Sequence, residues 1–116
     1  NVYYRKDRNF KPITKLNTIS IKKNMGWCND IKSKKYNKLI KVNKKIKHEK
    51  LFREDYKYDY LIPVNYNSKN TKIGKGSAIF IHLTKNYIPT AGCIGIKKRD
   101  MLILLKLLSK KTRIKI

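Results

Sequence analysis

The stretch "SAIFIHL", residues 77–83, is the clearest strand of the sequence. Successive side chains of a strand point to opposite faces, so its residues divide into two sets. One face carries Ala78, Phe80 and His82, and the other carries Ile79, Ile81 and Leu83. Since both faces are largely apolar, we expect this strand to lie in the interior of a sheet.

The chain before this strand predicts further short strands. "YDYLIPVNY", residues 58–66, is rich in aromatic and β-branched residues and predicts a strand, in which Pro63 indicates an edge or a bulge. Alternating apolar residues in 15–23 predict another short strand. Residues 24–30, rich in Gly, Asn and Asp, predict a turn, and the Lys-rich residues 31–50 predict mostly loop.

The chain after this strand predicts a helix over residues 100–109. Its apolar stripe at helical spacing consists of Met101, Leu104, Leu105 and Leu108. Asp100 favours the start of the helix by capping it or by its charge. Residues 112–116 predict a closing strand. The sequence therefore indicates one mostly β domain over residues 1–116 with one late α-helix.

The composition is strongly basic, with a formal net charge of +23. Of the 30 basic residues, 25 are Lys and five are Arg, and Lys, Asn, Ile and Tyr are all encoded by A/T-rich codons. We therefore interpret much of the charge as a bias at solvent-exposed positions, with attraction to an anionic polymer and nucleic-acid binding as alternatives. No apolar run of about 18 residues is present, so no transmembrane segment is expected.

A thiol and an imidazole stand close together in the sequence: Cys93 follows His82 by eleven residues. A connection of that length allows the chain to fold back and bring the two side chains to hydrogen-bond distance. An adjacent imidazole raises the thiolate fraction of a cysteine, and Gly92 and Gly95 permit close approach by a substrate. The alternatives are a core histidine, a small core cysteine and ordinary turn glycines.

The segment "GSAIFIH…PTAGCIGI" resembles the active-site segment of the L,D-transpeptidase (YkuD-type) catalytic domain. That family carries a His on one strand and then a [Ser/Thr]-x-Gly-Cys element, which residues 90–93 match. Further segments are similar to a proteobacterial branch of the family: "MGWCND", "KYN", "HEKLFREDYKYD" and "VNYN". Two positions differ from the common form, which has Arg where this chain has Gly95 and Gly where it has Leu83. Domains of this family usually have more strands before the position of Asn1, so we expect the sequence to be N-terminally incomplete.

The resemblance implies a mixed-sheet β-sandwich and acyl transfer between peptidoglycan stem peptides. Cys93 would be the nucleophile, His82 the base and Thr90 a residue that orients His82. The backbone N–H groups of Gly92 and Cys93 would hold the oxyanion. The partners are a donor and an acceptor stem, with no cofactor, no metal and no specific nucleic acid. We expect a monomer in the periplasm or cell envelope.

Five further residues are candidates for substrate binding, each with a structural alternative. They are Trp27, Asp30, Tyr36, Asn37 and Arg53. Trp27 is also a candidate core anchor, and Arg53 is also a candidate partner of Glu49 in a local ion pair. His48 is expected to be exposed and Cys28 to be an inert, small residue. Two other functions stay open, a basic nucleic-acid-binding module and a catalytically inactive wall-binding relative.

Overall fold

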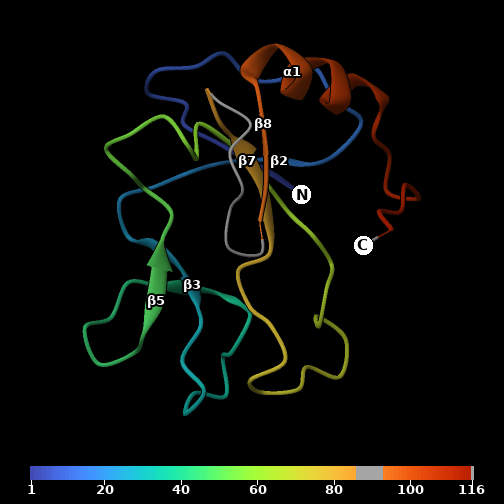
Figure 1. Cartoon of the computed structure of the whole chain (residues 1–116). Helices are drawn as coiled ribbons and strands as arrows, with labels where there is room; N and C mark the ends of the chain where they lie inside the picture. The colour runs from blue at the N-terminus through green and yellow to red at the C-terminus, as the bar shows by residue number, and fades with distance from the viewer. Residues whose placement is uncertain (86–92, 116) are drawn as a thin grey trace.

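The computed structural model describes residues 1–85 and 93–115, which form eight strands in two sheets and one helix (Figure 1). The larger sheet has the order β2-β1-β6-β7-β8 and the smaller sheet the order β4-β3-β5. The larger sheet contains β1 (Val2–Tyr4), β2 (Thr18–Ser20), β6 (Tyr60–Pro63), β7 (Phe80–Leu83) and β8 (Ile94–Ile96). The smaller sheet contains β3 (Met25–Cys28), β4 (Leu39–Lys41) and β5 (His48–Lys50). The predicted mostly β, mixed-sheet fold with one late helix is confirmed.

The larger sheet is mixed. β1 runs parallel to β2 and β7 runs parallel to β8, while β6 is antiparallel to both of its neighbours. β7 lies between β6 and β8, so the prediction of an interior strand is confirmed. Because both of its edges are paired and both of its faces are covered, β7 holds its side chains in fixed positions.

Two apolar cores lie on opposite faces of this sheet. Ile81 and Leu83 of β7 pack with Met101 and Leu105 of the helix α1 (Lys98–Leu107) on one face. Phe80 packs on the other face, in a cluster reached by side chains of β3. The predicted division of β7 into two faces is therefore confirmed. In Figure 1, α1 lies at one end of the molecule and the smaller sheet lies towards the other.

The helix begins two residues before the predicted start. Its N-cap is Lys97, which makes no capping side-chain bond, and Asp100 lies in the first turn instead. A carboxylate there still favours the positive end of the helix dipole. The predicted stripe is confirmed, since Met101 and Leu105 are fully buried and Leu104 and Leu108 are partly buried against the same core.

Several predictions of local structure are wrong. Residues 25–28, predicted as a turn, form β3, and the predicted loop 31–50 contains β4 and β5. Residues 112–115 are exposed and form no strand. β6 is not an edge strand: Pro63 is tolerated at its end because β1 pairs only with Tyr60 and Leu61 and leaves no ladder partner for the proline nitrogen on that side.

Candidate active site

The parallel pair β7–β8 places His82 and Cys93 on one face of the larger sheet. His82 stands opposite Gly95, and Cys93 precedes Gly95 by two residues, so the side chain of Cys93 points to the same face as that position. Cys93 packs against the cluster that contains Phe80, and Phe80 shares its face with His82. The two predicted reactive side chains are therefore diagonal neighbours on the face turned towards the smaller sheet.

His82 is buried and held by its own strand. Its Nδ1 lies 2.9 Å from the carbonyl oxygen of Leu83, and only 7% of the residue is exposed. This contact is satisfied by the tautomer with the proton on Nδ1, which leaves Nε2 as an acceptor. An imidazole held in this way is suited to take a proton from a neighbouring group.

Cys93 is half-buried and forms no disulfide among the described residues. Its Sγ donates to the carbonyl oxygen of Ala78 at 3.3 Å. Ala78 has a positive φ of 57°, an uncommon conformation for a residue with a side chain. This contact was not predicted, because residues 77–79 were expected to belong to the strand, whereas β7 begins at Phe80. The thiol is thus anchored on the chain that leads into β7.

Thr90 and Gly92 lie in residues 86–92, outside the described residues. Their predicted roles in orienting His82 and in holding the oxyanion therefore stay predictions. Cys93 itself is described, and its backbone N–H stays a candidate oxyanion donor.

Tyr58 lies near both reactive residues. It was not predicted as a site residue from the sequence. Its ring centroid lies 5.9 Å from that of His82, and its ring belongs to the cluster against which Cys93 packs. Its hydroxyl donates to Oε1 of Glu49 at 2.9 Å. Burial, and then the charge of Glu49, raises the pKa of Tyr58 well above its usual value, so the phenol stays neutral.

Arg53 contacts both Tyr58 and Glu49. Its guanidinium lies over the ring of Tyr58, 5.1 Å from the centroid, and it forms an ion pair with Glu49 at 3.6 Å. It also binds both carboxylate oxygens of Asp55, at 2.9 and 2.6 Å. The local Glu49–Arg53 ion pair considered from the sequence is therefore present. A substrate carboxylate would have to compete with Asp55 for Arg53.

An open groove of about 510 Å³ begins at this network. It is lined by Glu49, Lys50, Phe52, Arg53, Glu54 and Asp55. Glu49 and Arg53 line the groove and also contact Tyr58, whose ring packs against that of His82. The predicted contact between Arg53 and substrate has a place in this groove and stays a prediction.

Trp27, Tyr36 and Asn37 lie together in a hydrogen-bonded cluster. Oδ1 of Asn37 accepts from Nε1 of Trp27 at 2.9 Å, and Nδ2 donates to the carbonyl oxygens of Tyr66 and Asn67, each at 2.9 Å. The Tyr36 hydroxyl accepts from the backbone N–H of Gly76 at 3.2 Å. These bonds tie the smaller sheet to the chain that leads into β7.

The Trp27 ring also meets Phe80 edge to face, with centroids 5.4 Å apart. It is therefore a core anchor on the face that carries His82. A role for Trp27, Tyr36 or Asn37 in substrate binding stays a prediction.

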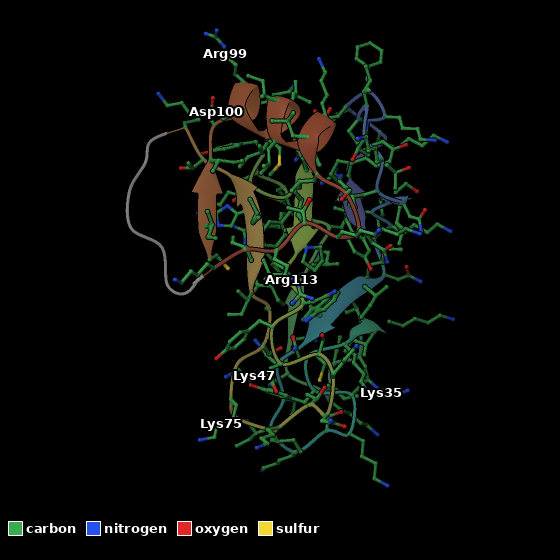
Figure 2. All side chains as sticks on the ribbon, turned by 90° about the vertical axis from the view of Figure 1, so that its right-hand side faces the viewer. Lys35, Lys47, Lys75, Arg99, Asp100 and Arg113 are labelled. Atoms are coloured by element: carbon green, nitrogen blue, oxygen red, sulfur yellow. The ribbon has the colours of Figure 1, made fainter. Side chains whose placement is uncertain are left out.

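Asp30 fastens a loop of the smaller sheet. Its carboxylate accepts from the backbone N–H groups of Lys47 at 3.0 Å and of Lys32 at 2.9 Å. These two bonds lower the pKa of Asp30, and the bond from Lys47 has the larger effect. Figure 2 shows Lys47 at the end of the molecule away from α1. A contact of Asp30 with substrate stays a prediction.

Two remaining side chains of interest lie in the smaller sheet. Cys28 is fully buried, as expected of an inert residue. His48 is half-buried, so the expectation of an exposed side chain is wrong. The reason is the β3–β5 pairing, which lays its ring beside Gly26: a Cβ atom there would stand 3.0 Å from Cδ2 of His48.

The described residues hold no group of three or more His, Cys, Asp or Glu side chains that could bind a metal ion. In residues 1–85 and 93–115 no helix has the length and apolar character needed to cross a bilayer.

In this two-sheet β domain His82 lies on β7 and Cys93 directly precedes the parallel strand β8, so a thiol and an imidazole share one face. This arrangement defines a class of protein in which cysteine chemistry is expected. The family model for the L,D-transpeptidase catalytic domain, YkuD, matches residues 2–116. The chain therefore belongs to this family of transpeptidase-type enzymes. Comparison with curated proteins and with solved structures finds no match.

Proposed function

We propose that this domain is a peptidoglycan L,D-transpeptidase in which Cys93 is the nucleophile and His82 the general base. The observation that carries the proposal is the shared face: His82 on β7 and Cys93, directly before β8, are diagonal neighbours. The Nδ1 contact of His82 with Leu83 supports it, because it leaves Nε2 available as the proton acceptor. Membership of the family supports the substrate class, the stem peptides of peptidoglycan.

The first half-reaction transfers the donor acyl group to the enzyme. Nε2 of His82 takes the proton of the Cys93 thiol, and the thiolate attacks the carbonyl carbon of the donor stem between an L-centre and a D-residue. The thiol leaves its bond with the Ala78 carbonyl as it does so. When the tetrahedral intermediate collapses, the C–N bond breaks, and His82 returns the proton to the departing amine. A thioester on Cys93 and a free D-residue amine result.

The second half-reaction consumes the thioester. An amine of an acceptor stem attacks the thioester carbonyl, His82 accepts the proton that the amine loses, and the C–S bond breaks to release the Cys93 thiolate. The proton then returns from His82 to the thiolate, and a new amide cross-links the stems. If water attacks in place of the amine, the product is a carboxylate and the outcome is L,D-carboxypeptidase activity.

Tyr58 gives His82 a defined position during both steps. Its ring packs against the imidazole, and Glu49 and Arg53 hold the ring from the other side. A fixed imidazole is favourable because proton transfer depends steeply on the geometry of donor and acceptor. We further propose that the protein acts as a monomer in the periplasm or cell envelope, because its proposed substrates are peptidoglycan stems.

The test is incubation of the purified protein with muropeptides, followed by mass spectrometry of the products. Cross-linked or trimmed muropeptides are expected from the wild type. Loss of either reactive group, in Cys93→Ala or His82→Gln, should lower the rate by roughly a hundredfold or more. Cys28→Ser serves as the matched control, because it removes the other thiol. No product from the wild type, or equal rates for wild type and Cys93→Ala, would refute the proposal.

A further inference from the structure

One end of the molecule combines protruding apolar side chains with cations. Phe10 is 93% exposed and Ile13 is 74% exposed, both in the loop between β1 and β2. Ile103 and Leu107 on α1 are 50% and 72% exposed. Phe10 and Ile13 line a groove of about 380 Å³ between this loop and the helix, and Ile103 and Leu107 follow the groove residues Leu102 and Lys106 along α1. We call these residues, with Lys11, Lys98, Arg99 and Lys106, the helix-end surface.

Helix geometry makes this surface continuous. Lys98, Leu102 and Lys106 are spaced four residues apart and form the helical side of the groove. Arg99 and Ile103 form the next stripe around the helix, about 100° further towards solvent. Figure 2 shows Arg99 extending outward from α1 at the end of the molecule. The helical side of the groove, with its two lysines, therefore adjoins the outward stripe of α1.

The cations of this surface have no acidic partner among the described residues. The ion pairs of the described residues engage Arg5, Arg8 and Arg53, and Arg8, which lines the groove, pairs with Asp59. Asp100 is the one carboxylate carried by α1. Lys11, Lys98, Arg99 and Lys106 thus present a net positive field around exposed apolar groups.

We propose that the helix-end surface docks on an anionic lipid bilayer. Interfacial protein surfaces combine aromatic and aliphatic side chains, which enter the boundary of headgroups and acyl chains, with Lys and Arg, which meet the anionic headgroups. Phe10 and Ile13 are the side chains that enter, and Lys98 and Lys106 are the cations beside them. A second copy of the chain is disfavoured, because it would bring two sets of cations together. A nucleic acid would gain little from Phe10 and Ile13 at its phosphate backbone.

Docking through this surface has a consequence for orientation. α1 covers the face of the larger sheet opposite to the cluster that contains Phe80 and adjoins Cys93. A lipid-bound molecule would therefore turn His82 and Cys93 away from the bilayer. The proposal itself rests only on the helix-end surface and does not depend on the chemistry of Cys93.

The test is cosedimentation of the protein with lipid vesicles. Wild-type protein is expected to bind vesicles of equal parts phosphatidylcholine and phosphatidylglycerol, and not vesicles of phosphatidylcholine alone. Phe10→Ser/Ile13→Ser should weaken binding roughly tenfold or more through the apolar area that no longer enters the bilayer. Lys98→Gln/Lys106→Gln should weaken it roughly 20- to 30-fold through the two lost charges.

Matched variants remove the same groups elsewhere on the protein. Ile31→Ser/Ile73→Ser replaces two exposed isoleucines, 61% and 54% exposed, outside the surface. Lys35→Gln/Lys75→Gln removes two cations at the opposite end of the molecule, as Figure 2 shows. Both controls should bind much more tightly than the corresponding surface variants. If the controls weaken binding as much as the surface variants, the proposal is overturned in favour of unspecific charge attraction. Sedimentation equilibrium tests the other alternative. If the wild type is a dimer and Phe10→Ser/Ile13→Ser is a monomer, the proposal is overturned in favour of a second copy.

Discussion

The imidazole of His82 lies beside the backbone of Gly95, so that a Cβ atom added to Gly95 would stand 3.6 Å from Cε1 of His82. Thr84 is closer still, with Cβ and Cγ2 each 3.2 Å from the same point. Glycine at this position therefore leaves the imidazole and Thr84 room on the face that carries Cys93. The larger side chain that the common form of the family has at this position would require Thr84 to move.

Gly95→Ala should lower stability and disturb the reactive pair together. The added methyl group crowds Thr84 and should cost about 1–2 kcal/mol in the free energy of unfolding. Because Thr84 and His82 lie on the same side of Gly95, the imidazole should shift and the transpeptidase rate should fall. Gly74→Ala is the control: its φ of +83° makes alanine strained, but nothing lies within 4 Å. The control should lose about 1 kcal/mol and keep its rate; equal rates for both variants would contradict the prediction.

The two cysteines should differ sharply in reactivity towards iodoacetamide. Cys28 is fully buried in β3, whereas Cys93 is only half-buried and lies on the face that carries the imidazole of His82. Alkylation of Cys28 requires local opening, so Cys93 should react at least about a hundredfold faster in the native protein. Peptide mass spectrometry after timed labelling measures both rates. In denaturant the two thiols should react alike, and a native Cys28 that reacts first would contradict the burial seen here.

The sequence was informative where hydrophobic patterning is strong. The two faces of β7, the interior place of this strand and the helical stripe of α1 all follow from apolar residues at regular spacing. The smaller sheet was missed because β4 and β5 carry lysines and half-exposed residues, and backbone pairing with β3 holds them in place. Such pairing leaves little trace in the spacing of apolar residues.

Only some residues of the candidate site could be predicted from the sequence. His82 and Cys93 could be paired from their spacing and their family resemblance. Tyr58 could not, because it lies before β6 and turns to the face opposite to that of Tyr60 and Ile62. Its partners Glu49 and Arg53 come from a part of the chain that was predicted to be loop or left unassigned. Only the tertiary fold brings Tyr58 to His82 and its two partners to Tyr58.

Asn37→Ala should be one of the most destabilising single substitutions in this chain. Asn37 is buried with a φ of 60°, and its amide joins Trp27 to the carbonyl oxygens of Tyr66 and Asn67. Alanine would remove the partner of the Trp27 indole N–H and of these two carbonyl oxygens, all in part-buried bonds, for an expected loss of about 2–4 kcal/mol. Urea unfolding followed by the fluorescence of Trp27, the single tryptophan, measures the change.

Asn70→Ala is the matched control for that substitution. Asn70 has a similar φ of 49° but is exposed, so the control changes backbone strain alone. A loss of about 1 kcal/mol is expected for it. If the two alanine variants unfold at the same urea concentration, the buried hydrogen bonds of Asn37 contribute nothing beyond its backbone conformation.

Acid should remove the contribution of Asp55 to stability within a defined pH range. The bonds from Arg53 lower the pKa of Asp55 from 3.8 to about 2. Because the folded-state pKa is depressed, the stabilisation is fully present above the unfolded value and is lost as pH falls from about 4 to about 2. Asp55→Asn should therefore be less stable than wild type at pH 6, by up to about 1 kcal/mol for a solvent-screened pair, and the difference should vanish near pH 2.

Thermal unfolding from pH 6 to pH 2 measures this difference, with Glu54→Gln as a control that removes a neighbouring, exposed carboxylate. A gap between wild type and Asp55→Asn that is the same at pH 2 and pH 6 would show that the Arg53–Asp55 pair does not stabilise the fold through its charge.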